Sequence, residues 1–298
     1  MLVLAPVLLA MAAATVHVSD VSAQTGERAI YASVLDKSGA PVAAVKAADL
    51  VVREDGVTRE VLGVAPAAEP LRIAVLVDTS QAMTRHVNDV RSALRSFFRD
   101  LQGDNEIALF EFGDRPTLLT DYTNDAAQLN AGIGRLFARR GSGAYVLDAI
   151  VDASKSLRVR EGRDQKRRVI VVISADGPEF SNRHYRSVVE EVERTNATLH
   201  SFLLEPSRRV RLSDAQRERE LALDAGARAT GGRREHLLTS MALDDQLRGL
   251  AQELKGQYRV VYSRPTTLIA PDSLRVSVKE PGWTVRAPRV VPAWRSSR

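Results

Sequence analysis

Two continuous apolar runs, each leading to a carboxylate, constrain the fold of this 298-residue chain more than any other feature. The first is RIAVLVD at 72–78, and the second is RVIVVIS at 168–174, which leads to Asp176. Runs without polar alternation are typical of strands that are covered on both faces of a parallel sheet. Amphipathic helical patterns, such as the one at 87–101, alternate with these runs. The alternation predicts an α/β fold, a doubly wound and mostly parallel sheet with helices on both faces.

The same patterns predict the other elements of this core. Further strands are expected at 107–112, 198–204 and 233–237, with an antiparallel partner at 117–122. Helices are expected at 126–137, 145–157, 185–195 and 214–227, with a last helix that Gly256 ends. The α/β core is therefore predicted to span residues 71–257.

Both flanks of this core have β character. Residues 24–66 contain short β-prone runs at 30–35, 50–54 and 58–64, and Asp55-Gly56 between two of them predicts a hairpin turn. Residues 65–70 are expected to form a linker. The segment 258–298 again shows β-prone runs divided by turns. We therefore expect the two flanks to pair into one small β module.

The first 23 residues have the pattern of a secretory signal peptide. An apolar run from Leu2 to Val16 is followed by a polar stretch that ends in Val21-Ser22-Ala23, a cleavage-like sequence. A membrane anchor is the alternative, but the run is short of the roughly 20 apolar residues that a spanning helix needs. We expect an exported chain, periplasmic or secreted, with no transmembrane span after cleavage. Since the chain has no cysteine, it has no disulfide and no thiolate metal site.

The net charge of +5 raises the question of a nucleic-acid partner. The basic residues are scattered in short clusters, such as Arg139-Arg140 and 166–168, and aromatic residues make up only 5% of the chain. Most of these clusters are expected in solvated loops and helix ends. Stacking platforms for bases are not present in this pattern, so no nucleic-acid partner is predicted.

The strand-end carboxylates are the main candidates for chemistry. If the two buried strands are neighbours, Asp78, Ser80 and Asp176 converge at the edge of the sheet where ligands bind in such folds. A third loop, 141–144, precedes the helix that carries Asp148. A cluster of oxygen atoms of this kind suits a hard divalent cation such as Mg²⁺.

The segments IAVLVDTSQAM, GSGAYVLDAI and VIVVISADG, in this order and spacing, resemble the von Willebrand factor A (VWFA) domain over about residues 71–257. The resemblance implies a doubly wound α/β sheet with a metal-ion-dependent adhesion site, whose loops supply Asp-x-Ser-x-Ser, a Thr and an Asp. The flanking segments resemble an exported bacterial subgroup that is often called VWFA-related and is found in Acidobacteria.

The resemblance assigns the site position by position. The first Asp matches Asp78, the first Ser matches Ser80 and the final Asp matches Asp176. The second Ser falls on Ala82 and the Thr on Ala144, neither of which has a side-chain oxygen. The site implied by the resemblance is therefore degenerate.

Three interpretations of this degenerate site stay open. In the first, Asp78 and Asp176 are purely structural and bond loop amides. In the second, the three remaining ligands together with water molecules hold Mg²⁺ or Mn²⁺ weakly. In the third, Ser142, Thr84 or Glu179 supplies the missing oxygen atoms.

The resemblance and the absence of enzyme motifs favour a protein–protein interaction module over an enzyme. Loops 78–84, 140–145 and 176–182 are expected to form its recognition face. The contact residues predicted there, for a partner that the sequence does not identify, are Thr79, Gln81, Thr84, Ser142, Tyr145 and Glu179.

Two alternatives belong to other functional classes. One is a metal-dependent hydrolase that uses Asp78 or Asp176, although no nucleophile elbow, P-loop or paired-histidine zinc motif is present. The other is an envelope assembly component that acts through the β module. No catalytic residue is predicted, since the histidines are scattered without the spacing of metal ligands. His200 lies within an expected strand, as a packed or surface residue. The mixed-charge run 217–220 is expected to be a solvated helix face.

Overall fold

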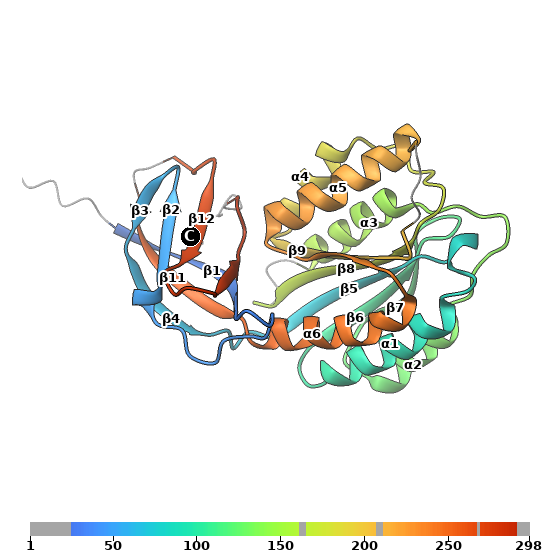
Figure 1. The fold of residues 1–298 in the computed structure, drawn as a ribbon, viewed down its shortest axis with the longest axis horizontal. Coiled ribbons are helices and arrows are strands. Elements are labelled where there is room, and N and C mark those ends of the chain that lie inside the picture. Colours follow the sequence, from blue (N-terminus) through green and yellow to red (C-terminus); the bar gives the residue numbers. More distant parts are fainter. Residues whose placement is uncertain (1–24, 161–164, 207–210, 267–268, 291–298) are drawn as a thin grey trace, which may run out of the picture.

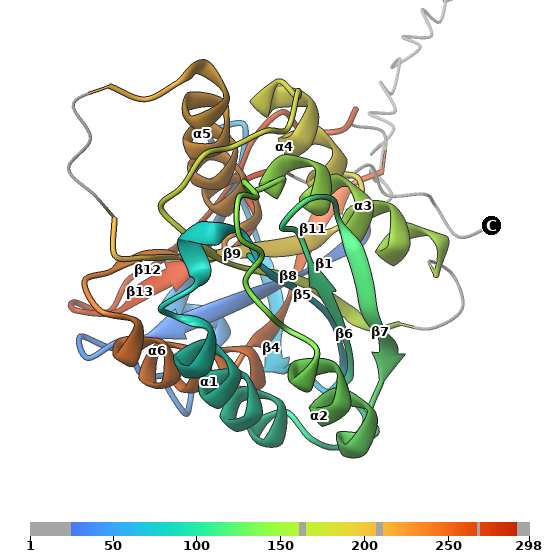
Figure 2. The same cartoon turned by 90° about the vertical axis from the view of Figure 1, so that its right-hand side faces the viewer.

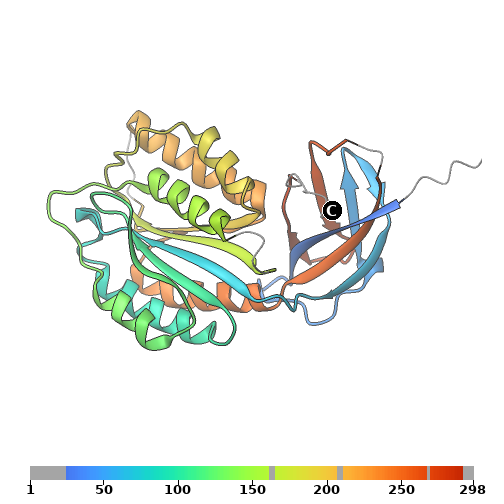
Figure 3. The same ribbon diagram turned by 180° about the vertical axis from the view of Figure 1, so that it is seen from behind.

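The computed structural model describes residues 25–160, 165–206, 211–266 and 269–290 of the chain. The proposed signal peptide, residues 1–23, and the end of the chain from 291 lie outside these described residues. Two lobes stand side by side, an α/β lobe and a β lobe (Figure 1). Seen from behind, the chain passes from one lobe to the other between β4 and β5 and again between α6 and β11 (Figure 3).

The α/β lobe is built on a six-stranded sheet in the order β10-β9-β8-β5-β6-β7. All neighbouring pairs are parallel except β6 and β7, which are antiparallel, as the sequence predicted. The strands are β5 Leu71–Val77, β6 Glu106–Glu111, β7 Thr117–Thr123, β8 Arg167–Ala175, β9 Ala197–Leu204 and β10 Arg234–Leu237. The doubly wound α/β fold is confirmed.

Helices cover both faces of this sheet (Figure 2). On one face lie α1 Val87–Asp100, α2 Ala126–Gly134 and α6 Leu243–Lys255, and on the other lie α3 Val146–Val159, α4 Tyr185–Glu193 and α5 Asp214–Thr230. Alternate residues of β5 explain the arrangement, since Val75 belongs to the core under α1 and α6, whereas Leu76 belongs to the core under α3. Both sets are apolar, so both faces of the strand must be covered. Within the described residues, no helix has the length and apolar character that crossing a bilayer requires.

The β lobe joins the two ends of the chain. Its strands are β1 Thr25–Leu35, β2 Leu50–Glu54, β3 Val57–Arg59, β4 Val61–Pro66, β11 Tyr258–Pro265, β12 Leu274–Val278 and β13 Thr284–Arg286. They form two sheets, in the orders β13-β1-β11-β4 and β12-β2-β3. Each sheet combines strands from before and after the α/β lobe, which places the two flanks in one unit.

The hairpin predicted at Asp55-Gly56 connects β2 and β3, with both residues at positive φ (47° and 82°). The predicted strand 58–64 is instead two strands that Glu60 separates. The predicted linker 65–70 is also shorter than expected, because Ala65 and Pro66 pair with β11 and extend β4. That pairing depends on a strand almost 200 residues later in the chain, so the local sequence around Ala65 does not indicate it.

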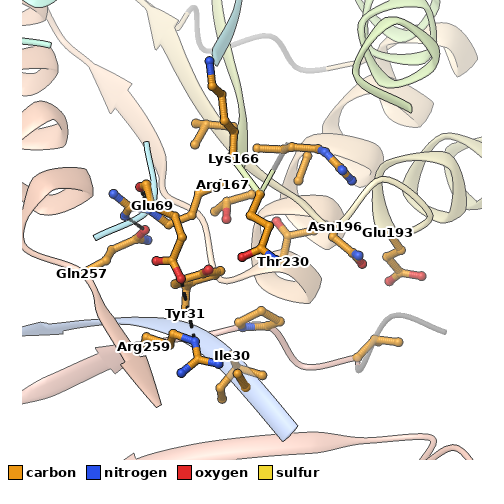
Figure 4. A pocket seen from close by; sticks show the side chains of 18 of the residues that line it. Ile30, Tyr31, Glu69, Lys166, Arg167, Glu193, Asn196, Thr230, Gln257 and Arg259 are labelled. Carbon is orange, nitrogen blue, oxygen red and sulfur yellow. Dashed lines mark hydrogen bonds and ion pairs between the residues drawn. The ribbon is translucent and has the colours of Figure 1, made fainter. Parts of the chain in front are cut away.

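A cavity of about 620 Å³ lies between the lobes, at the amino ends of β8 and β9 (Figure 4). Arg167 lines it and is only 8% exposed, because its guanidinium donates to the backbone carbonyls of Glu69 and Leu254 and to Oε1 of Gln257. The expectation that the basic cluster 166–168 is solvated is therefore wrong for Arg167. This arginine ties β8 to the chain segments that lead into and out of the β lobe.

Candidate functional site

Asp78 and Asp176 leave the sheet at the same edge. β5 and β8 are adjacent and parallel, with Val77 opposite Ile173, so the residues that follow them enter neighbouring loops. The predicted adjacency of these two strands, on which a convergence of their end residues depends, is confirmed. The loops after β9 and β10 leave the sheet at the same edge, since these strands run in the same direction as β8. The loop before α3 reaches this edge as well, because the N–H of Arg139 donates to the carbonyl of Thr79.

Asp78 is completely buried, and both of its carboxylate oxygens accept hydrogen bonds from backbone N–H groups. The N–H of Ser80 donates to Oδ1 at 2.7 Å, and the N–H of Ala175 donates to Oδ2 at 3.1 Å. Burial raises the pKa of Asp78, and these hydrogen bonds together with the charge of Arg219 oppose the shift. Asp78 thus clamps the loop after β5 to the end of β8.

The two alanines at the ligand positions are packed. A side chain on Gly177 would lie 2.8 Å from the methyl group of Ala82, so the loops after β5 and β8 approach each other closely there. Ala144 is completely buried, its N–H donates to the carbonyl of Pro178 at 2.9 Å, and its carbonyl accepts from the N–H of Phe180 at 2.8 Å. The loop before α3 is therefore paired with the loop after β8 through the backbone.

Glu179 is directed to the start of α3. Its Oε2 accepts from the N–H of Val146 at 3.3 Å, and its Oε1 accepts from the N–H of Ser181 at 3.1 Å. The hydroxyl of Ser181 in turn accepts from the N–H of Asp148 at 3.2 Å. Free N–H groups in the first turn of a helix form an anion site, and here side chains of the chain itself occupy it. Burial also raises the pKa of Glu179.

Arg219 is the residue of this site that the sequence analysis missed. It lies on α5, it is 1% exposed, and its Nη2 is 3.7 Å from Oδ1 of Asp176. Its Nη1 donates to the carbonyl of Gly177 at 3.3 Å, and it pairs with Glu220 at 3.2 Å. The expectation that 217–220 is a solvated helix face is wrong for this position. A clue was present in the sequence, because Arg219 is in helical phase with Ala222, which is also buried.

The divalent ion that the resemblance implies does not fit these residues. Two ligand positions are methyl groups, and the Asp78 oxygens already accept N–H groups. An ion bound to Asp176 would lie roughly 6 Å from the Arg219 guanidinium, where charges of +2 and +1 repel by about 5 kcal/mol at an effective dielectric constant of about 20. Within the described residues, no group of three or more His, Asp or Glu side chains is arranged to hold a metal ion.

The predicted contact residues differ in accessibility. Gln81 and Thr84 are exposed, Ser142 and Tyr145 are half-buried, and Thr79 and Glu179 are buried. Gln81 also links two loops, since its Oε1 accepts from the N–H of Gly141 at 2.8 Å. The two buried residues support the loops from within and offer no surface to a partner.

Large apolar side chains are exposed in the loops at the same edge of the sheet, and sequence reasoning did not single them out. Phe180 is 54% exposed, and its ring lies 6.0 Å from that of Tyr145. The others are Phe137, Leu212, Leu238 and Met241. Exposed apolar side chains at one edge of a sheet offer surface that a partner can cover.

A cleft of about 320 Å³ opens beside Asp176. His86 and the ion pair between Arg85 and Glu205, with Nη2 and Oε2 3.1 Å apart, also line it. Glu205 adopts a positive φ of 44°, which is uncommon outside glycine. The cleft therefore carries charges of both signs.

Replacing Asp78 by alanine is expected to lower the free energy of unfolding by about 2 kcal/mol, because two buried N–H donors lose their acceptor. Urea unfolding monitored by circular dichroism measures the change. Asp114→Ala is the matched control, since that carboxylate is exposed and pairs only loosely with Arg139 at 3.7 Å. Equal stability of the two variants would show that the Asp78 clamp contributes nothing.

Comparisons with known proteins agree with this geometry. Residues 73–178 match the family model of the von Willebrand factor type A domain. A von Willebrand factor type A structure from Catenulispora acidiphila is 11% identical, with a TM-score of 0.53 over 90% of this chain and 74% of that one. Proximal thread matrix protein 1 from the mussel byssus, solved with a zinc-occupied MIDAS motif, is 10% identical, with a TM-score of 0.51 over 68% of this chain and 49% of that one. A comparison with curated protein sequences finds no match. Residues 73–178, about a third of the chain, therefore resemble the von Willebrand factor type A domain, and the α/β lobe has the fold of solved domains of that type.

Proposed function

We propose that the protein is an exported protein–protein interaction module, and that the loops at the carboxyl edge of its central sheet form the recognition face. The observation that carries this proposal is the group of exposed apolar side chains in those loops, among them Phe180, Leu238 and Met241. Such side chains lose their contact with water when a partner covers them, which favours association.

The same proposal includes weak or absent divalent-metal binding and no catalytic role. The methyl groups of Ala82 and Ala144 support weak binding, since neither can coordinate an ion. The internal pairing of Asp78 supports a structural role for that carboxylate instead of a nucleophilic one. Export rests on the signal-like pattern of residues 1–23, and membership of the exported bacterial subgroup rests on the β segments that flank the domain.

Site-specific photo-crosslinking tests the recognition face. A photoreactive amino acid placed at Phe180 is expected to capture a partner in the envelope fraction of the native organism. The matched control is the same amino acid at Leu62, which is 47% exposed on β4 and lies far from the loops. Running both with and without a chelator shows whether capture depends on metal, and we expect that it does not.

Each alternative function predicts a different result. Capture at position 62 alone would support an assembly role for the β lobe and would contradict our proposal. Turnover of a phosphoester, peptide or glycoside substrate that disappears in the Asp78→Ala/Asp176→Ala double variant would support the hydrolase.

A further inference from the structure

The surroundings of the Arg219 guanidinium consist largely of acidic groups. Its Nη2 lies 3.2 Å from Oε1 of Glu220 on the same helix and 3.7 Å from Oδ1 of Asp176. Its positive charge also opposes the rise that burial causes in the pKa values of Asp78 and Glu179. Asp78 is completely buried and Glu179 is 4% exposed. Three carboxylates from two loops thus share the field of one buried cation that α5 supplies.

Buried carboxylates of this kind need a positive charge nearby. Removing a charged group from water costs several kcal/mol unless it is paired, and several like charges in one place also repel one another. In a metal-dependent site of this geometry, a divalent ion would supply the charge. Here the guanidinium of Arg219, which is 1% exposed, supplies a positive charge near the same carboxylates.

The hydrogen bond that Arg219 donates to the Gly177 carbonyl does not explain its presence. Gln216, one helical turn earlier on α5, donates to the same carbonyl from its Nε2 at 3.0 Å. An uncharged side chain therefore already attaches α5 to this turn. The contribution that Gln216 cannot make is a positive charge beside Asp176.

We infer that Arg219 is the built-in cation of this site, that it takes the place of the divalent ion, and that the domain holds its loops together without metal. The inference does not rest on the proposed interaction function, because loop stability and ion binding can be measured without a partner. Being buried, Arg219 also cannot be reached by an acidic side chain of a partner, unlike an ion with an open coordination position.

Three variants separate the charge of Arg219 from its volume. Arg219→Met keeps most of the volume and loses the charge, Arg219→Lys keeps the charge, and Arg217→Met changes an exposed arginine of the same helix as a control. We expect Arg219→Met to lower the Tm by about 5–10 °C and Arg219→Lys to lose less than half as much. The control should stay within about 1 °C of the wild type.

Divalent ions provide the decisive measurement. About 5 mM MnCl₂ or MgCl₂, or a chelator, should shift the wild-type Tm by less than about 1 °C. In the Ala82→Ser/Arg219→Met double variant, which restores one hydroxyl and removes the cation, the same MnCl₂ should raise the Tm by about 4 °C.

Stabilisation of the wild type by Mn²⁺, or equal Tm values for Arg219→Met and Arg219→Lys, would overturn the inference. If the methionine variants do not fold, calorimetric titration of the wild type and of Arg219→Lys with MnCl₂ still tests the inference. No heat of binding in either protein supports the inference, and binding to the wild type contradicts it. Failure of the crosslinking experiment at Phe180 would leave all of these results unchanged.

Discussion

Replacing Glu54 by alanine is expected to lower the free energy of unfolding by about 4 kcal/mol. Glu54 is 1% exposed, and its Oε2 accepts from Nε of Arg59 at 3.0 Å and from Nε of Arg264 at 2.9 Å. Its Oε1 accepts from the hydroxyl of Tyr262 at 2.9 Å. Breaking a buried pair on one side leaves the other charge buried and uncompensated, a loss of about 3–5 kcal/mol.

Glu54 lies on β2, before the α/β lobe, whereas Arg264 and Tyr262 lie on β11, after it. The loss therefore falls on the contact that joins the two flanks of the chain. Urea unfolding monitored by tryptophan fluorescence and circular dichroism measures it, with Glu60→Ala on the exposed surface as the control. A loss below about 1 kcal/mol would mean that the apolar core of the β lobe holds the flanks together without this carboxylate.

Acidification is expected to destabilise the protein through His200. This residue on β9 is 1% exposed, and burial lowers its pKa to about 3, with the charges of Arg233 and Arg286 as smaller causes. In the unfolded chain the pKa is about 6.5. Below pH 6.5 the unfolded state therefore binds a proton that the folded state does not, so stability falls as the pH falls and the loss ends near pH 3.

The slope from this one group is about 1.4 kcal/mol per pH unit, or about 5 kcal/mol over the whole interval. His200→Asn keeps an acceptor for the N–H of Arg233, which donates to Nδ1 of His200 at 3.1 Å, and it has no titrating group. Chemical denaturation between about pH 4 and pH 7 should show a smaller slope for this variant than for the wild type. His236→Asn is the matched control, because His236 is exposed, and it should keep the wild-type slope. Identical slopes for wild type and His200→Asn would contradict the assignment.

Much of the architecture was predictable from local sequence patterns. Residues 73–77 and 169–173 are all apolar, which is typical of a strand that is covered on both faces. The antiparallel β7, the Asp55-Gly56 hairpin and the pairing of the two flanks followed from turn residues and β-prone runs. Errors occurred where a boundary depended on a distant partner, as at Ala65 and Pro66, which pair with β11.

The candidate site was predictable only in part. Asp78 and Asp176 could be placed at one edge because parallel strands end on the same side of a sheet. Arg219 could not be assigned to them, because it is far away in the sequence and lies in a run of alternating charges that usually faces solvent. The burial of Arg167 was missed for the same reason, since its acceptors come from segments on both sides of the α/β lobe.

The sequence by itself determined which segments become strands and helices, which faces are apolar and which carboxylates stand at strand ends. These properties follow from side-chain periodicity, which is local. Only the tertiary structure decided which charges are buried and what neutralises them. A charged side chain can be buried only where other segments supply its partners, so the state of Asp78, Asp176 and Arg219 depends on how the loops and α5 meet in space.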